Sequence, residues 1–236
     1  MSANKYKVLS LSSLKWIALI TMLIDHTAAT MIPHYNMLQE LTNIDIAVVY
    51  DVMRGIGRLS FPIFCFCIVE GFIHTRNVKK YLIRLFIFAL ITEPIYDLAF
   101  FGRALYLDYQ NVLWTFLISM LMLMAVKKYS QSILLKVIII LIFALIAWLL
   151  KTDYSYIGVI IIAVYYLYRE KNWVKLGATA ILLLDMAVIG AALTCLYNGE
   201  KGKGLKYLFY VFYPAHLLLL YIINSNIIEH LKVFTK

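Results

Sequence analysis

Residues 133–150 read ILLKVIIILIFALIAWLL, a run in which Lys136 is the only charged residue. A membrane-spanning helix needs about 20 mostly apolar residues, with a tolerated range of about 17–25. A lipid bilayer offers no water to satisfy backbone amides, so an open chain crosses it only as helices. This stretch therefore predicts a membrane-spanning helix.

The rest of the chain has the same character. Of its 236 residues, 63% are hydrophobic and 15% are charged, whereas soluble domains average about 45–50% apolar and about 25% charged residues. So large an apolar excess must face lipid. The predicted fold class is all-α, a polytopic membrane bundle of about eight transmembrane helices that forms a single domain over residues 1–236. The other seven spans are predicted near residues 14–33, 58–75, 79–100, 110–127, 154–169, 173–197 and 205–224.

The basic residues predict the orientation, because cytoplasmic loops of membrane proteins carry an excess of Lys and Arg. With the N-terminus inside, most Lys and Arg residues lie on the cytoplasmic side, and an even number of spans places both termini there. The exception is the segment at 199–206, GEKGKGLK, which falls outside in this arrangement. The net charge of +9 is explained by anchoring to anionic lipid, and we expect no nucleic-acid partner.

The three cysteines, Cys65, Cys67 and Cys195, all lie within apolar runs. The sequence contains no CxxC and no Cys/His spacing typical of a zinc site. Cysteines in such surroundings usually act as small buried hydrophobic side chains. We therefore expect neither a disulfide framework nor a bound metal.

Charged residues in the second and third spans are informative, because a charge at mid-bilayer costs at least about 2.5–3.5 kcal/mol. The two spans form a hairpin that turns near Asn77, so residues equally distant from the turn share a depth. Glu70 matches Arg84, and Arg58 matches Asp97. We expect both pairs to be ion pairs, which either neutralise charge within the hairpin or line a polar cavity.

Three further residues of this hairpin belong to the same polar region. His74 lies four residues after Glu70 and therefore on the same helix face. Glu93 lies one turn before Asp97, and Pro94 is expected to kink the helix beside it. Such a kink would open space around the face that carries Glu93 and Asp97.

The first span carries Lys15, Asp25 and His26. Lys15 and His26 are eleven residues apart, which returns to nearly the same helix face about 16 Å further along the axis. Asp25 points away from that face. The side chains of His26, His216 and Asp185 are expected to share the midplane of the membrane. A neutral histidine at that depth suits a general base, and the alternative is a hydrogen-bonded packing residue.

Several motifs together resemble the TraX family. They are LKWIA at 14–18, IDH at 24–26, GRLSFPIF at 57–64, EGFIHTRN at 70–77, YLIRL at 81–85, TEPIYD at 92–97, QNV at 110–112, DY at 153–154 with Gly158, and YPAHL at 213–217. The resemblance covers most of the chain and is strongest over residues 54–98. It implies a conjugative pilin acetyltransferase, which acetylates the pilin N-terminus, within a wider group of transmembrane acyltransferases.

In the acyltransferase-three family of that wider group, a basic residue, ten intervening residues and a histidine mark the first helix. Lys15 and His26 fit this spacing, although Lys replaces the usual Arg and a lysine cannot hold a phosphate bidentately. The resemblance implies that acyl-CoA, with acetyl-CoA as the expected donor, binds from the cytoplasm with its phosphates near Lys15. Further basic residues at that rim are Arg76, Lys79 and Lys80.

The resemblance also implies the chemistry. His26 either removes a proton from the acceptor or briefly carries the acyl group, and Asp25 and His216 are further catalytic candidates. The acceptor would be a peptide N-terminus or a surface glycan on the outer face of a bacterial plasma membrane. The substrate-binding candidates are Lys15, Arg58, Glu70, His74, Arg84, Glu93, Asp97, Asn111, Asp185 and Tyr213.

Three other functions fit parts of the same pattern. A small proton-coupled transporter could use His26, His216 and Asp185, because charged residues inside membranes also serve proton relays, but no inverted repeat supports it. An intramembrane metal hydrolase would combine the two histidines with Asp25 and His74, which are dispersed and contain no HExxH-type motif. The third is a non-enzymatic scaffold.

Overall fold

The computed structural model describes residues 6–31, 45–129, 131–203 and 207–234. Throughout this part of the chain the regular structure is α-helical, without a β-sheet. The helices are α1 (Leu11–Met31), α2 (Ile46–Gly57), α3 (Ser60–His74), α4 (Val78–Phe101), α5 (Val112–Lys128), α6 (Ile133–Leu149), α7 (Ser155–Leu167), α8 (Asn172–Leu182), α9 (Ala187–Cys195) and α10 (Leu208–Phe234). The all-α prediction is confirmed.

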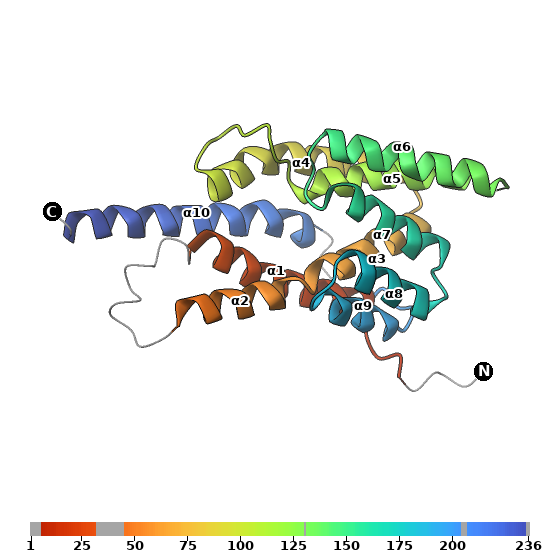
Figure 1. The fold of residues 1–236 in the computed structure, drawn as a ribbon, viewed down its shortest axis with the longest axis horizontal. Coiled ribbons are helices and arrows are strands. Elements are labelled where there is room, and N and C mark those ends of the chain that lie inside the picture. Colours follow the sequence, from red (N-terminus) through yellow and green to blue (C-terminus); the bar gives the residue numbers. More distant parts are fainter. Residues whose placement is uncertain (1–5, 32–44, 130, 204–206, 235–236) are drawn as a thin grey trace.

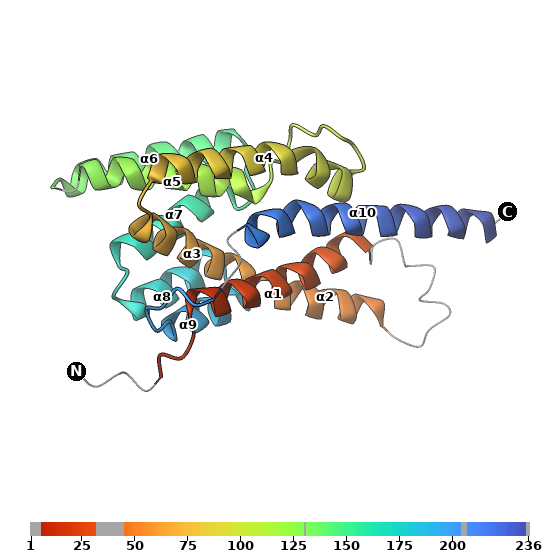
Figure 2. The ribbon, with the colours of Figure 1, turned by 180° about the vertical axis from the view of Figure 1, so that it is seen from behind.

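The long helices lie roughly along one axis, so the molecule has two distinct ends (Figures 1 and 2). α4, α5 and α6 form one group and α1 and α2 another, while α10 packs against both α1 and α4. α3 lies between them and contacts α1, α7 and α9. We name the basic end as the end at which α4, α6 and α8 begin and α3, α5 and α7 finish, and the far end as the opposite one.

The first six predicted spans each correspond to one helix, with bounds that differ by a few residues. They are α1, α3, α4, α5, α6 and α7. Pro94 lies inside α4, which continues from Val78 to Phe101. Local composition was sufficient here because each of these runs is predominantly apolar and long enough to be recognised in a short window.

The prediction of one span at 173–197 is wrong. Two short helices occupy this stretch, α8 with 11 residues and α9 with 9. At about 1.5 Å per residue they are about 16 and 13 Å long, roughly half of a 30 Å hydrocarbon core. The chain reverses between them at Leu184 and Asp185, whose φ angles are 55° and 62°. Positive φ is usually supplied by glycine; aspartate tolerates it, but leucine at this conformation is uncommon.

α8 and α9 form a hairpin whose two ends both lie at the basic end. α8 begins there, and after α9 the amide of Asn198 donates to the carbonyl of Leu9 at 2.9 Å. The next residues stay beside the start of α1, where the amide of Leu11 donates to the carbonyl of Glu200 at 2.9 Å. The predicted outer position of 199–206 is therefore wrong for residues 199–203, and residues 204–206 lie outside the described part of the chain.

α10 runs parallel to α1, from the basic end towards the far end. Phe209 faces Lys15 near the start of α1, with 5.0 Å between the ammonium nitrogen and the ring centroid. Near the other end, the side-chain amide of Asn224 donates to the carbonyl of Thr30 at 3.1 Å. α1 therefore begins and α10 finishes at opposite ends of the molecule (Figure 1). The prediction that both termini lie on one side of a membrane is therefore not confirmed.

α2 was not predicted as a helix. It begins at its N-cap Asp45, whose carboxylate accepts from the amide of Ala47 at 3.0 Å, an interaction that satisfies a free helix amide. Only Arg58 and Leu59 separate α2 from α3, and residues 46–74 are together long and apolar enough to cross a membrane. Residues 208–226 of α10 are the second such stretch among the described residues.

The surface of α6 shows why the apolar excess does not fit a soluble core. Ala144 and Ala147 are its fully buried residues, whereas Leu141, Leu145 and Trp148 are more than half exposed. Contiguous apolar surface of this kind is rare on soluble monomers. The buried core lies instead between α3, α5 and α7.

Candidate functional site

The two histidines expected at mid-membrane are in direct contact, one on α1 and one on α10. Nδ1 of His26 lies 2.7 Å from Nε2 of His216, and the imidazole planes are 11° from parallel. The His216 side chain is buried, with 5% of its surface exposed. The packing of α10 against α1 thus joins residues that are 190 positions apart in the sequence.

The hydrogen bonds indicate which nitrogens carry protons. Nδ1 of His216 lies 2.7 Å from the carbonyl oxygen of Phe212, which can only accept. A neutral His216 therefore carries its proton on Nδ1 and accepts on Nε2. His26 must then donate from Nδ1, which leaves its Nε2 with an unprotonated lone pair. That atom has the electronic character of a general base or a nucleophile.

Aromatic side chains surround the histidine pair. Phe100 of α4 packs edge-on against His26 at a centroid distance of 5.3 Å, and Tyr213 lies at 5.9 Å. Phe212 stacks on His216 at 5.0 Å. These rings shield the buried His216 from water, and the lower local dielectric strengthens its electrostatic interactions.

Asp25 does not contact His216 but forms an ion pair on a different face of α1. Its carboxylate lies 2.6 Å from the Arg54 guanidinium of α2. α2 can approach closely because residue 57 is glycine, and a Cβ there would lie 2.2 Å from the Asp25 Cβ. Arg54 was not among the predicted site residues, since no local pattern indicates that α2 packs beside α1.

Glu93 and Asn111 form a polar cluster towards the far end. The Glu93 carboxylate accepts from the indole nitrogen of Trp114 at 2.6 Å and from both the backbone and side-chain amides of Asn111. Asn111 is fully buried and also caps α5. Trp114 is a second residue that sequence reasoning missed.

The predicted ion pair between Arg58 and Asp97 is wrong. Asp97 is fully buried and accepts from the backbone amide of Tyr106 at 2.7 Å, whereas Arg58 is exposed. Among the described residues, the second carboxylate oxygen of Asp97 and the hydroxyl of Thr92 have no hydrogen-bond partner. The similar depth of Arg58 and Asp97 did not predict their pairing, because the loop after α4 folds back over Asp97.

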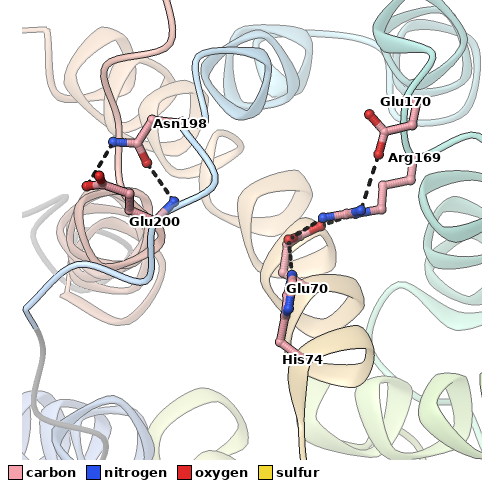
Figure 3. Close-up of polar contacts among 6 residues, drawn as sticks. All are labelled: Glu70, His74, Arg169, Glu170, Asn198 and Glu200. Carbon is pink, nitrogen blue, oxygen red and sulfur yellow. Dashed lines mark hydrogen bonds and ion pairs between the residues drawn. The ribbon is translucent and has the colours of Figure 1, made fainter. Parts of the chain in front are cut away.

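The predicted ion pair between Glu70 and Arg84 is also wrong. The buried Glu70 carboxylate is held by Arg169, with contacts of 2.6 and 3.0 Å, and by His74 at 3.3 Å (Figure 3). Arg84 instead lies beside the ring of Tyr81, 5.7 Å from its centroid. His74 does share the helix face of Glu70, as expected from their spacing.

The remaining candidates lie at three different places. Lys15 is at the basic end of α1 against Phe209, Tyr213 is buried beside the histidines, and Asp185 is exposed at the α8–α9 turn. Asp185 therefore does not share a site with His26 and His216. Its expected depth depended on a single span that is absent.

Asp153, in the loop between α6 and α7, adds a titratable group at the far end. Burial raises the pKa of its carboxyl to about 6, although a hydrogen bond donated by Tyr109 at 3.0 Å opposes the rise. The backbone carbonyl of Asp153 accepts from the Thr115 hydroxyl. The loop is thereby held against the start of α5.

A family model described as TraX protein matches residues 10–224 of the chain. The chain belongs to the TraX family. Proteins of this family are membrane proteins. The chain is also similar to the probable fimbrial assembly protein FimC, serogroup H1, of Dichelobacter nodosus, with 35% identity over 244 residues that cover 88% of this chain and 92% of the relative. No solved structure matches the chain.

The family resemblance seen in the motifs is thus confirmed. The name of the relative refers to fimbrial assembly. The roles assigned to individual residues stay predictions. Of the catalytic candidates, the structure brings His26 and His216 together and places Asp25 on a different face of α1 with Arg54.

Proposed function

We propose that this TraX-family chain is a membrane-bound acyltransferase. It transfers an acyl group, with acetyl as the expected one, from cytoplasmic acyl-CoA to an amine or hydroxyl on the outer side of the membrane. The acceptor is a peptide N-terminus, as in pilin acetylation, or a surface glycan. The observation that carries the proposal is the hydrogen-bonded pair of His26 and His216 in an aromatic enclosure.

His26 is the base in this mechanism, and His216 positions it. Nε2 of His26 accepts the proton of the acceptor amine or hydroxyl as that group attacks the thioester carbonyl carbon. The carbon–sulfur bond breaks, and the proton passes to the departing CoA thiolate to give the free thiol. The bond from His26 to His216 keeps the proton of His26 on Nδ1, so that the reacting nitrogen stays available.

The donor side of the site is the basic end. Lys15 and His26 both face α10, where they contact Phe209 and His216 respectively. Lys15 can therefore hold a CoA phosphate at the basic end while the extended pantetheine arm carries the thioester along α1 to His26. A single ammonium supplies a point charge rather than a bidentate clamp, so other basic residues are needed to share the phosphates.

The acceptor side is the far end. Phe100, which touches His26, lies on α4 in the turn after Asp97. The acidic cluster of Glu93 and Asp97 is thus connected to the histidine pair along one helix. An amine that arrives from this side as an ammonium ion would meet carboxylates, which attract it and can take its extra proton, so that the neutral amine reaches His26. The acidic residues thus favour an amine acceptor.

We further propose the following arrangement in a bacterial plasma membrane. α1, α2 with α3, α4, α5, α6, α7 and α10 cross the bilayer, and the α8–α9 hairpin enters and leaves from the cytoplasmic side. The basic end faces the cytoplasm, in accordance with the excess of Lys and Arg there. The segment at 199–203 then no longer violates this rule, because it lies beside the start of α1.

The test is acetyl-CoA turnover by the purified protein in detergent, followed as release of free thiol. Each reaction is run with and without a pilin-type N-terminal peptide or a membrane extract as acceptor. We expect wild-type turnover that depends on the acceptor and falls by about 10²–10⁴-fold in His26→Ala. Tyr168→Phe, an exposed change near the end of α7, is the control and keeps wild-type turnover.

Two results separate the rival functions. If the protein shows no turnover and does not bind acetyl-CoA, the acyltransferase proposal is overturned. A proton-coupled transporter that uses His26 and His216 is then favoured. Acetyl-CoA binding without turnover would retain the enzyme class and reject the acceptors tried. In the transporter case, proteoliposomes should show proton uptake that His26→Ala abolishes.

A further inference from the structure

A pocket at the basic end lies outside the histidine site. It has a volume of about 170 Å³ and opens between α3, α8 and the segment that follows α9. Pockets that enclose whole small-molecule ligands usually measure about 300–1,000 Å³, so this one suits a single chemical group. The side chains that decide its chemistry are Lys7, Glu70, Arg169, Glu170, Lys175 and Cys195.

The acidic side chains of the pocket already have cationic partners. Glu70 is held bidentately by Arg169, with contacts of 2.6 and 3.0 Å. Glu170 lies 3.2 Å from the same guanidinium (Figure 3). The charge of Arg169 is therefore offset within the protein, and neither carboxylate is available to a further cation.

Lys175 of α8 is the exception. It is 3% exposed and lines the pocket, with its ammonium 5.3 Å from the centroid of the Phe66 ring. In the described part of the chain, no carboxylate forms an ion pair with it and its ammonium has no hydrogen bond. A buried ammonium without an ion-pair or hydrogen-bond partner is unfavourable, so this position is suited to an anion.

Two other features of the pocket attract negative charge. Lys7 contributes a second ammonium group to the lining. α8 begins at Asn172, which also lines the pocket, and runs for 11 residues. The free amides at the start of a helix carry partial positive charge and commonly bind phosphate.

We propose that this pocket binds a phosphate group, with the Lys175 ammonium as its principal ligand. A phosphate that carries up to two charges can meet Lys175, Lys7 and the start of α8 at once, which a singly charged carboxylate does less well. The phosphate can belong to a soluble ligand such as CoA or to the headgroup of an anionic lipid. The inference does not depend on the acyl-transfer reaction.

Cys195 provides a direct readout, because it lines the same pocket. Cys65 and Cys67 are buried, with 0% and 6% of their surfaces exposed, whereas Cys195 is partly exposed. In the full-length protein in detergent, a maleimide should modify Cys195 first, and mass spectrometry identifies the modified residue. We expect inorganic pyrophosphate to slow this modification in a concentration-dependent manner.

Matched variants assign the effect to Lys175. Lys175→Met removes the charge at similar volume and should raise the pyrophosphate concentration needed for half-protection by about 10–100-fold. Lys175→Arg keeps a charge and should keep the protection. Lys171→Met, an exposed neighbour outside the pocket, should behave as wild type.

The source of the phosphate is decided by further arms of the same experiment. Protection by CoA in detergent would indicate a soluble ligand. Protection in phosphatidylglycerol nanodiscs, but not in phosphatidylcholine nanodiscs, would indicate a lipid headgroup. The proposal is overturned if pyrophosphate, CoA and phosphatidylglycerol all fail to protect wild-type Cys195, or if Lys175→Met is protected as well as wild type. Neither result involves turnover, so the proposed enzyme activity is tested separately.

Discussion

A hydrogen bond of 2.7 Å joins Nδ1 of His26 to Nε2 of His216 across the interface of α1 and α10. The 2.7 Å contact from Nδ1 of His216 to the Phe212 carbonyl makes the pair directional. The backbone of α10 thereby determines which nitrogen of His26 is free. This relay assigns different roles to two chemically identical side chains.

The relay predicts unequal effects of the two histidines. His216→Phe keeps an aromatic ring but removes the acceptor for His26, so turnover should fall by roughly 10–100-fold, less than in His26→Ala. The KM for acetyl-CoA should change little, because His216 does not reach the basic end. Steady-state kinetics on both variants measures this, and a larger loss in His216→Phe than in His26→Ala would exchange the two roles.

The observed partner of Glu70, Arg169, and the predicted one, Arg84, can be compared by their contributions to the free energy of unfolding. Arg169→Met should lower the free energy of unfolding by about 3 kcal/mol, because it leaves a carboxylate with 1% exposure without its main partner. Glu70→Gln should relieve most of that loss. Arg84→Met should cost about 1 kcal/mol, the scale of its cation–π contact, and Glu70→Gln should not relieve it.

Thermal or denaturant unfolding in detergent gives these differences. If Glu70→Gln rescued Arg84→Met and not Arg169→Met, the pairing inferred from equal depth would hold in place of the one described above. The double variants therefore decide between the two pairings.

The contact of α9 with α3 depends on the absence of a side chain. A Cβ on Gly190 would lie 2.3 Å from the carbonyl oxygen of Leu59 and 2.9 Å from its Cα, and this backbone cannot easily move. Gly190→Ala should therefore destabilise the protein by about 1–3 kcal/mol. Gly177→Ala is the matched control, since nothing lies within 4 Å of that position, and should stabilise α8 by about 0.5–1 kcal/mol. Equal melting temperatures for the two variants would contradict the packing.

The hairpin of α8 and α9 predicts the accessibility of its flanking segment. In a background without the three native cysteines, Lys201→Cys should be protected from a membrane-impermeant maleimide in intact cells. Arg103→Cys, at the far end of α4, should be labelled. After permeabilisation both should react. Labelling of Lys201→Cys in intact cells would instead support the predicted eight-span topology, in which residues 199–206 lie on the outer side.

Asp153 predicts a pH dependence of stability. Its folded-state pKa of about 6 lies above the unfolded value of about 3.9, so the folded protein binds more protons between these pH values. The stabilising contribution is fully present below about pH 4 and is lost as the pH rises through 6. Melting temperatures from pH 4 to 7 should show a decrease that is absent in Asp153→Asn.

Tyr109 and Asp108 supply the checks on this assignment. Tyr109→Phe removes the hydrogen bond that favours the charged carboxylate, so the transition should move to higher pH. Asp108→Asn changes an exposed carboxylate in the same region, with 65% of its side-chain surface exposed, and should retain the wild-type profile. An unchanged profile in Asp153→Asn would assign the titration to another group.

The fold class and most helices were predictable because they depend on composition over short windows. Runs such as 133–149 are apolar throughout, and backbone hydrogen bonding in lipid leaves them one regular structure. The turn at Leu184 and Asp185 was not predictable, since the surrounding residues are as apolar as a span. α2 was missed because its 12 residues are fewer than the about 17 that a membrane-spanning helix needs.

Within the site, the sequence was enough to place the two histidines at one depth, but it did not identify which charged residues form ion pairs. Chain spacing gives the depth of a residue along a helix, and this placed His26 and His216 at one level. It does not give the rotation of each helix about its axis or the identity of its neighbours. Glu70 meets Arg169, 99 positions away, because α7 packs against α3, and Asp25 meets Arg54 because α2 returns along α1.

Composition and motifs thus establish a helical membrane protein of the TraX family with histidines on its first and last helices, because apolar content and residue order are local properties. The packing of distant helices establishes which charges pair, which nitrogen of His26 is free, and that α8 and α9 turn back to the basic end. These depend on long-range contacts, whose energies favour one arrangement among many that share the same local pattern.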